Sequence, residues 1–176
     1  MNSITLPKGW KKEQTAAATT KKENLTKPEE QSESKNNQPS YIIPVADKIN
    51  IQELIAKYNI TLDNKNIDEW LNTWSDDGVW STPFGEAKGK TELKNFINQI
   101  TNEFASDKRH VSTNIIVEIT SNNTASAQSY LIVTEAKRIP EVVATGAYID
   151  ALKKNTDDKW KFVHRRLEVD LIIDSN

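Results

Sequence analysis

The spacing of the apolar residues changes once along the chain, and this change sets the order of the secondary structure. Before residue 107, apolar side chains recur with the period of a helix in three segments that contain Ile51, Ile67 and Leu93. After residue 107 they alternate with polar side chains, as in strands. The alternating segments are residues 111–119, 125–139, 142–154 and 160–173. Their short connections favour antiparallel pairing, and helices followed by a sheet predict an α+β domain.

The helical segments have recognisable limits. The first is expected over residues 51–62 and the third over 93–104. Asn66 followed by Glu69 is typical of a capping box, so a second, short helix is expected to start there and to run to Trp74. The Asp-Asp-Gly sequence at 76–78 should end it, before a short strand at 79–82.

The first 45 residues differ in composition from the rest of the chain. They are rich in Lys, Glu, Gln, Asn, Ser and Thr and contain four of the six prolines. Such a segment has too little apolar surface to offset the entropy lost on ordering the backbone. We therefore expect residues 1–45 to be a disordered tail and residues 46–176 to form one folded domain.

The composition excludes several classes of function. The chain has no cysteine and two histidines, so no metal site and no cysteine nucleophile is predicted. A net charge of −2 argues against nucleic-acid binding. No apolar run reaches the roughly 18 residues that span a membrane, and the N-terminus lacks a secretory signal, so we expect no membrane association and a cytoplasmic location. With no Gly-rich phosphate loop, no cofactor is expected.

The order of short motifs in the domain resembles that of a known family. The motifs are Ile51–Tyr58 with Leu62-Asp63, Asp68–Trp70, Trp74–Asp77, Gly89-Lys90, Arg109-His110 with Asn114, Gly146–Asp150, Trp160–Phe162 and Arg165-Arg166 before Asp170. Together they resemble the SnoaL-like branch of the nuclear transport factor 2-like superfamily. The resemblance implies a cone-shaped α+β fold in which N-terminal helices pack on a curved antiparallel sheet that encloses a pocket.

The candidate catalytic residues are His110 and Asp63. Strand alternation places His110, Ser112 and Asn114 on one face, with Ile116 deeper along the strand. Asp63 and His110 fall where dehydratases similar to scytalone dehydratase place a pocket aspartate and histidine. A carboxylate beside an imidazole fixes its tautomer and favours its protonated form, so the pair could act as acid and base. Alternatively, Asp63 caps a turn and His110 is an exposed edge residue.

The resemblance departs from those dehydratases at two positions. The second pocket histidine has no counterpart in Ala127-Gln128-Ser129-Tyr130, and Leu62 stands in place of a tyrosine. Other side chains are candidates for contact with a substrate, although aromatic residues are more often part of a core. The candidates are Tyr58, Trp74, Trp80, Asn114, Tyr130 and Tyr148. Of the two arginines at 165 and 166, at most one should point inward and pair with Asp150 or Asp170.

The sequence is consistent with two functions. The first is a cofactor-independent lyase or isomerase, of dehydratase or cyclase type, that acts on a small hydrophobic molecule bearing a carbonyl group. The second is a ligand-binding or assembly module of the same fold without turnover. We also expect a homodimer, with a trimer as the alternative, because the outer face of the sheet should carry more apolar residues than one layer of helices covers. These residues are Val111, Ile115, Val117, Ile132 and Val163.

Overall fold

The computed structural model describes residues 45–103, 108–136 and 141–173, which all lie within the compact unit Tyr41–Asn176. The predicted tail, residues 1–45, lies outside the described residues except for Val45, which begins the first helix. No helix among the described residues is long and apolar enough to cross a membrane.

The described residues form three helices, in the order that the apolar period predicts. They are α1 (Val45–Asp63), α2 (Ile67–Leu71) and α3 (Gly89–Glu103). The side chain of Asn66 caps α2 by accepting a hydrogen bond from the backbone N–H of Glu69 at 3.3 Å. The start of α2 is therefore where the sequence predicts it.

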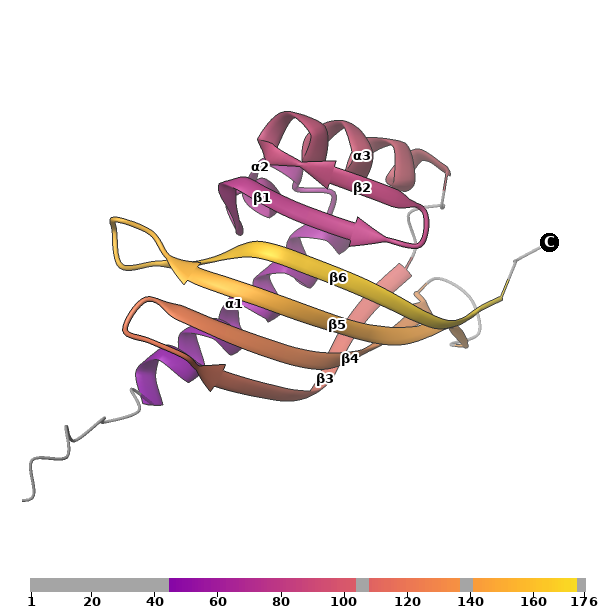
Figure 1. The fold of residues 1–176 in the computed structure, drawn as a ribbon. Coiled ribbons are helices and arrows are strands. Elements are labelled where there is room, and N and C mark those ends of the chain that lie inside the picture. The colour runs from indigo at the N-terminus through magenta and orange to yellow at the C-terminus, as the bar shows by residue number, and fades with distance from the viewer. Residues whose placement is uncertain (1–44, 104–107, 137–140, 174–176) are drawn as a thin grey trace, which may run out of the picture. The chain divides into compact units, whose positions relative to one another are not determined.

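Six strands form a single curved sheet that does not close (Figure 1). The strands are β1 (Trp74–Thr82), β2 (Gly85–Lys88), β3 (Lys108–Ile119), β4 (Thr124–Glu135), β5 (Val142–Lys154) and β6 (Trp160–Ile172). Their order in the sheet is β2-β1-β6-β5-β4-β3. The fold is thus the predicted α+β arrangement of helices followed by a sheet, and β5 has the predicted bounds.

The segment after α2 differs from its prediction. Trp74 does not extend the helix but begins β1, which continues through Asp76, Asp77 and Gly78. β1 pairs with β6 in parallel, so the sheet is mixed rather than wholly antiparallel. β2, which the sequence did not indicate, pairs with β1 across the turn at Pro83 and Phe84. A four-residue strand is too short for alternation to distinguish it from a loop.

The helices cover one face of the sheet and enclose an aromatic core. α1 crosses the strands diagonally and contacts β3 and β6, while α3 packs against β1 and β2 (Figure 1). Between them the rings of several aromatic residues, all buried except the partly buried Phe96, contact one another, with centroids 5.3–6.5 Å apart. These residues are Tyr58, Trp70, Trp74, Trp80, Phe96, Tyr148 and Phe162.

A bulge in β3 reverses the alternation of its side chains. Asn114 has φ 53°, and the pairing of β3 with β4 shifts register between Thr113 and Ile116. Before the bulge, His110 and Ser112 are partly buried; after it, Val117 is buried and Ile116 is 63% exposed. The prediction that Ile116 lies deeper in the pocket is therefore wrong. Val117 likewise belongs to the core and not to the outer apolar face.

Candidate active site

Two hydrogen-bonded pairs of side chains join α1 to β3. Asn59 and Asp63 are one helical turn apart, so they point from the same side of α1. His110 and Ser112 are two residues apart in β3, so they share the face that α1 covers. Asp63 pairs with His110, and Asn59 Nδ2 donates to Ser112 Oγ at 2.9 Å. The structure thus brings together the two residues that the sequence singles out as a pair.

Both carboxylate oxygens of Asp63 hold His110. The ring nitrogen Nδ1 lies 2.6 Å from Asp63 Oδ1, and the backbone N–H of His110 donates to Oδ2 at 3.0 Å. Because an ionised carboxylate can only accept, Nδ1 carries the proton. In the neutral ring, the lone pair is then on Nε2. Contact at both oxygens fixes the position of the imidazole as well as its tautomer.

The pair is partly open to solvent at the histidine. The side chain of His110 is 23% exposed, whereas that of Asp63 is 8% exposed. Among the described residues, none makes a hydrogen bond to Nε2 of His110. A small molecule that approached the ring would therefore meet a nitrogen that can accept or donate a proton.

Several buried polar atoms have no hydrogen-bond partner among the described residues. Within the described ranges they include Tyr58 Oη, Asn59 Oδ1, Ser129 Oγ and Arg165 Nη1. Each such atom costs about 1–3 kcal/mol when it is desolvated without a hydrogen bond. An oxygen-bearing molecule or an ordered water that supplied the missing partner would recover part of that cost.

A fully buried ion pair lies deeper in the same interior. Arg165 Nε and Nη2 donate to the two carboxylate oxygens of Asp150 at 2.8 and 2.9 Å. The guanidinium lies 4.1–4.2 Å from the ring centroids of Tyr58, Tyr148 and Phe162. Burial alone would lower the pKa of Arg165, but the charge and hydrogen bonds of Asp150 outweigh it and raise that pKa. The sequence predicts that at most one of Arg165 and Arg166 points inward and pairs with Asp150 or Asp170. In the structure the inward arginine is Arg165, and its partner is Asp150.

The two buried tyrosines stay protonated at neutral pH. Burial raises the pKa of Tyr148 to about 12, against the opposing charge of Arg165. Burial is the main cause that raises the pKa of Tyr58 well above its ordinary value, and the electrostatic effect of the neighbouring Tyr148 raises it further. Both hydroxyls can therefore donate hydrogen bonds. Tyr58 is 0% exposed and Tyr148 is 2% exposed, so a ligand would reach them only after a rearrangement of the core.

Two tryptophans among the candidate substrate contacts belong to the core. Trp74 is 1% exposed and packs against Phe162, and Trp80 is 4% exposed and packs edge-on against Phe96. Both are therefore part of the core, which is the alternative that the sequence allows for aromatic residues. Neither is open to solvent in this conformation.

Two other candidates lie away from His110. Tyr130 is 54% exposed and points to the opposite face of β4 from Ser129, because side chains alternate along a strand. Asn114 is exposed at the bulge, where its Oδ1 accepts a hydrogen bond from Thr113 Oγ1. The prediction that these two side chains line the pocket beside His110 is therefore wrong. The bulge accounts for Asn114, and the count of alternation in β4 would have placed Tyr130 outside.

Asn59 is the polar residue of this site that the sequence analysis missed. Its signal is the spacing of four residues to Asp63 on α1, which puts an amide and a carboxylate on one side of the helix. Elsewhere in the described part of the chain, no group of three or more His, Asp or Glu side chains is placed to hold a metal ion.

Comparison with known proteins identifies relatives of this fold. Residues 44–166 match the family model described as a SnoaL-like domain. A protein of unknown function with a cystatin-like fold from Nostoc punctiforme is 32% identical, with a TM-score of 0.68 over 72% of this chain and 92% of that chain. No protein with a curated description matches the sequence.

More distant structures share the fold. A protein from Novosphingobium aromaticivorans that is provisionally assigned as a scytalone dehydratase is 22% identical, with a TM-score of 0.64 over 74% of this chain and 89% of its own. ActVI-ORFA from Streptomyces coelicolor is 18% identical, with a TM-score of 0.64 over 70% of this chain and 97% of its own.

Proposed function

Since the chain belongs to the family of SnoaL-like domains, we propose that it is a small-molecule pocket protein in which His110 and Asp63 form an acid–base pair. The proposed reaction is a cofactor-independent elimination or isomerisation of a hydrophobic molecule that bears a carbonyl group. The observation that carries the proposal is the double contact of the Asp63 carboxylate with His110, through Nδ1 at 2.6 Å and the backbone N–H at 3.0 Å.

In this mechanism Nε2 of His110 is the nitrogen that meets the substrate. It removes a proton from the carbon next to the carbonyl, and the imidazolium that forms is stabilised by the Asp63 carboxylate. The same proton is then returned to another carbon in an isomerisation, or to a departing hydroxyl in a dehydration. The fold neighbour provisionally assigned as a scytalone dehydratase supports a dehydration of this kind.

The chemistry of the interior supports an oxygen-bearing ligand. Asn59 Oδ1 and Ser129 Oγ are buried without a partner among the described residues, and the hydroxyl of Tyr58 is protonated. A carbonyl oxygen of a substrate could accept hydrogen bonds from the hydroxyls of Ser129 and Tyr58, and a substrate hydroxyl could donate to Asn59 Oδ1. The surrounding aromatic rings would contact the apolar body of the substrate. We therefore place the substrate between His110 and the aromatic core.

A second function is favoured by the packing of that core. Tyr58, Trp74, Trp80 and Tyr148 contact one another or their neighbours and are at most 4% exposed, so the interior is filled in this conformation. A module that binds a ligand at the rim, or that serves in assembly, needs no open aromatic cavity. The reaction proposed above requires the core to make room.

Deuterium incorporation distinguishes the two functions without knowledge of the natural substrate. The full chain is incubated in D₂O with α-tetralone, a hydrophobic ketone, and exchange of the protons next to the carbonyl is followed by NMR. If the chain is an enzyme, we expect wild type to catalyse the exchange. His110→Gln should lower the exchange rate by about 10²–10⁴-fold and Asp63→Asn should lower it by less, with both variants folded. Binding of α-tetralone without exchange would favour the second function. Equal exchange by wild type and His110→Gln would refute the acid–base pair.

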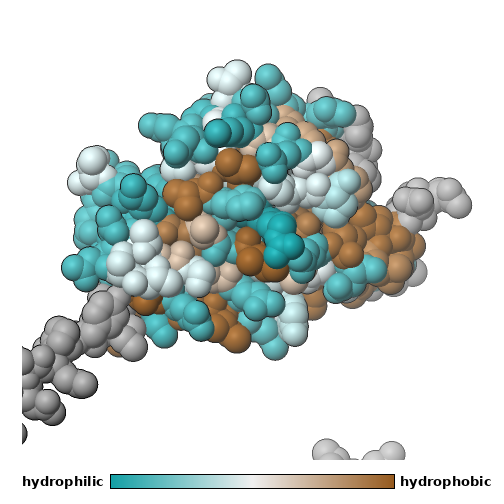
Figure 2. Space-filling view, in the orientation of Figure 1, coloured by the Kyte–Doolittle hydropathy of each residue, from teal (hydrophilic) through white to brown (hydrophobic). Residues whose placement is uncertain are grey.

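We further propose that two copies of the chain associate through the outer face of the sheet. Val111, Ile116 and Tyr130 are 45%, 63% and 54% exposed on β3 and β4. Val111 shares a cross-strand row with Leu171 of β6. Exposed apolar side chains also gather at the end of β6 that leads to the C-terminus (Figure 2). Such a surface is typical of an interface between protein chains.

A further inference from the structure

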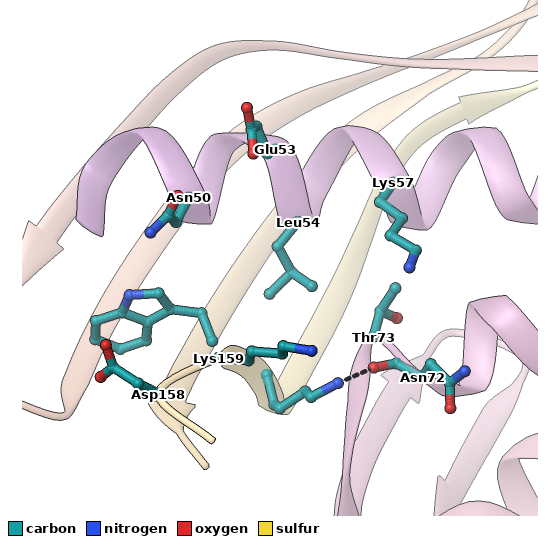
Figure 3. Close-up of a pocket in the computed structure, with 10 residues that line it drawn as sticks. Asn50, Glu53, Leu54, Lys57, Asn72, Thr73, Asp158 and Lys159 are labelled. Carbon is teal, nitrogen blue, oxygen red and sulfur yellow. Dashed lines mark hydrogen bonds between the residues drawn. The ribbon is translucent and has the colours of Figure 1, made fainter. Parts of the chain in front are cut away.

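A cleft lies apart from the His110 site, between α1, the start of β1 and the loop that leads into β6 (Figure 3). Its volume is about 320 Å³, at the small end of the range for ligand pockets. None of the residues that line it belongs to the pairs that join α1 to β3. The residues that line it include Leu54, Lys57, Asp158, Lys159, Trp160 and Lys161.

Three lysines give the cleft a positive wall. Lys57 is neutralised by Glu69, which lies outside the cleft, with Nζ 2.8 Å from Oε2. Lys161 Nζ donates to the uncharged backbone carbonyl of Asn72. Lys159 makes no ion pair with any described residue. Two ammonium groups in one small cleft, those of Lys159 and Lys161, therefore have no carboxylate of the described residues as a direct partner.

The acidic residues of the cleft do not supply that partner. Asp158 is held by Lys154, with Oδ1 at 3.0 Å from Nζ. Glu53 points away from the side of α1 that carries Lys57 (Figure 3). Burial, and next to it the charges of Lys57 and Lys159, lower the pKa of Lys161. A bound anion would relieve this repulsion.

The rest of the wall is apolar. Leu54 projects from α1 into the cleft, and Trp160 lines it while its indole N–H is satisfied by Asp47 at 2.8 Å. An apolar group could pack there without leaving a buried donor unpaired. At the packing density of organic crystals, this volume accommodates a molecule of about a dozen non-hydrogen atoms.

We infer that this cleft binds a small organic anion, whose phosphate or carboxylate contacts Lys159 and Lys161 and whose apolar body packs against Leu54 and Trp160. This site is independent of the acid–base pair, because it shares no residue with it. The inference therefore stands or falls separately from the proposed reaction.

The test is a titration of the full chain with phenyl phosphate, followed by NMR at the indole N–H of Trp160 and by calorimetry. Wild type should bind saturably, and Lys159→Gln should weaken binding about fivefold, the effect of one partly exposed charge. Asp158→Asn should tighten binding, because it removes a negative charge while Asn tolerates the φ of 58° at this position. Lys88→Gln removes a charge from exposed β2 outside the cleft and should leave the affinity within about twofold.

Two further ligands test the two halves of the site. Phenol should bind more weakly than phenyl phosphate because it lacks the negative charge, and inorganic phosphate should bind more weakly because it lacks the ring. Equal binding of phenol would overturn the charge recognition, and equal binding of inorganic phosphate would overturn the apolar contact. The inference as a whole fails if wild type shows no saturation up to about 10 mM, or if Lys88→Gln weakens binding as much as Lys159→Gln.

Discussion

Replacement of Asp150 by asparagine should be among the most destabilising single changes in the domain. Asp150 and Arg165 are both 0% exposed at the side chain, and two hydrogen bonds of 2.8 and 2.9 Å join them. Asp150→Asn keeps the size of the side chain but leaves the guanidinium buried without a counter-charge. The charge and hydrogen bonds of Asp150 raise the pKa of Arg165, so Asp150 favours the charged form of the guanidinium in the native protein.

The magnitude follows from the surroundings of Arg165. Removal of one partner from a buried ion pair costs about 3–5 kcal/mol. The rings of Tyr58, Tyr148 and Phe162, at 4.1–4.2 Å, continue to attract the cation and offset up to about 2 kcal/mol. We therefore expect a loss of about 3 kcal/mol in the free energy of unfolding. For a domain of this size, that loss corresponds to a melting temperature lower by about 10 °C.

Urea denaturation of four proteins measures this effect. They are wild type, Asp150→Asn, Arg165→Met and the double variant. The double variant should lose less stability than the sum of the two single variants, because no unpaired charge remains buried. Asp68→Asn is the control: it breaks an exposed pair with Lys94 and should change stability by at most about 0.5 kcal/mol. A loss below about 1 kcal/mol for Asp150→Asn would refute the reasoning.

The remaining predictions concern acid stability and assembly. Burial alone would raise the pKa of Asp47, but hydrogen bonds from Lys154 and Trp160 outweigh it and lower that pKa, so its contribution to stability is present at neutral pH and is lost as the pH falls below about 4. Urea denaturation at neutral and acidic pH should therefore show a smaller acid loss for Asp47→Asn than for wild type, and equal losses would contradict this. Light scattering at micromolar concentration should show a dimer that Ile116→Lys dissociates and Ile60→Lys, an equally exposed change on α1, does not; a monomeric wild type would contradict the interface.

Alternation along β3 correctly predicted which side chains share a face before the bulge and failed beyond it. It placed His110 and Ser112 together, as the structure does, but it also placed Asn114 and Ile116 on their face. The backbone of Asn114 at φ 53° inserts an extra residue, which exchanges the two faces of the strand. Asn adopts this conformation more readily than most residues, yet a single Asn in a strand pattern is not enough to predict a bulge.

The sequence also failed to predict where β1 starts and which residue pairs with the charged arginine in the core. Trp74 continues the apolar spacing of α2, so periodicity alone could not assign it to β1. The position of Arg165 in the core depends on Asp150, fifteen residues earlier and on the neighbouring strand, where the two are cross-strand partners. The alternation of side chains limits the inward arginine to at most one of Arg165 and Arg166. Only the register of β5 and β6 identifies its partner as Asp150.

The tautomer of His110 tests the central claim most directly. We assign its ring nitrogens by ¹⁵N NMR at a pH where the imidazole is neutral, and compare wild type with Asp63→Asn before and after addition of α-tetralone. The Asp63–Nδ1 contact of 2.6 Å predicts a proton on Nδ1 and a lone pair on Nε2 in wild type, with the ligand shifting the Nε2 resonance. In Asp63→Asn the preference for this tautomer should weaken. A proton on Nε2 in wild type, or an identical tautomer ratio in both proteins, would contradict the assignment of His110 as an acid–base group positioned by Asp63.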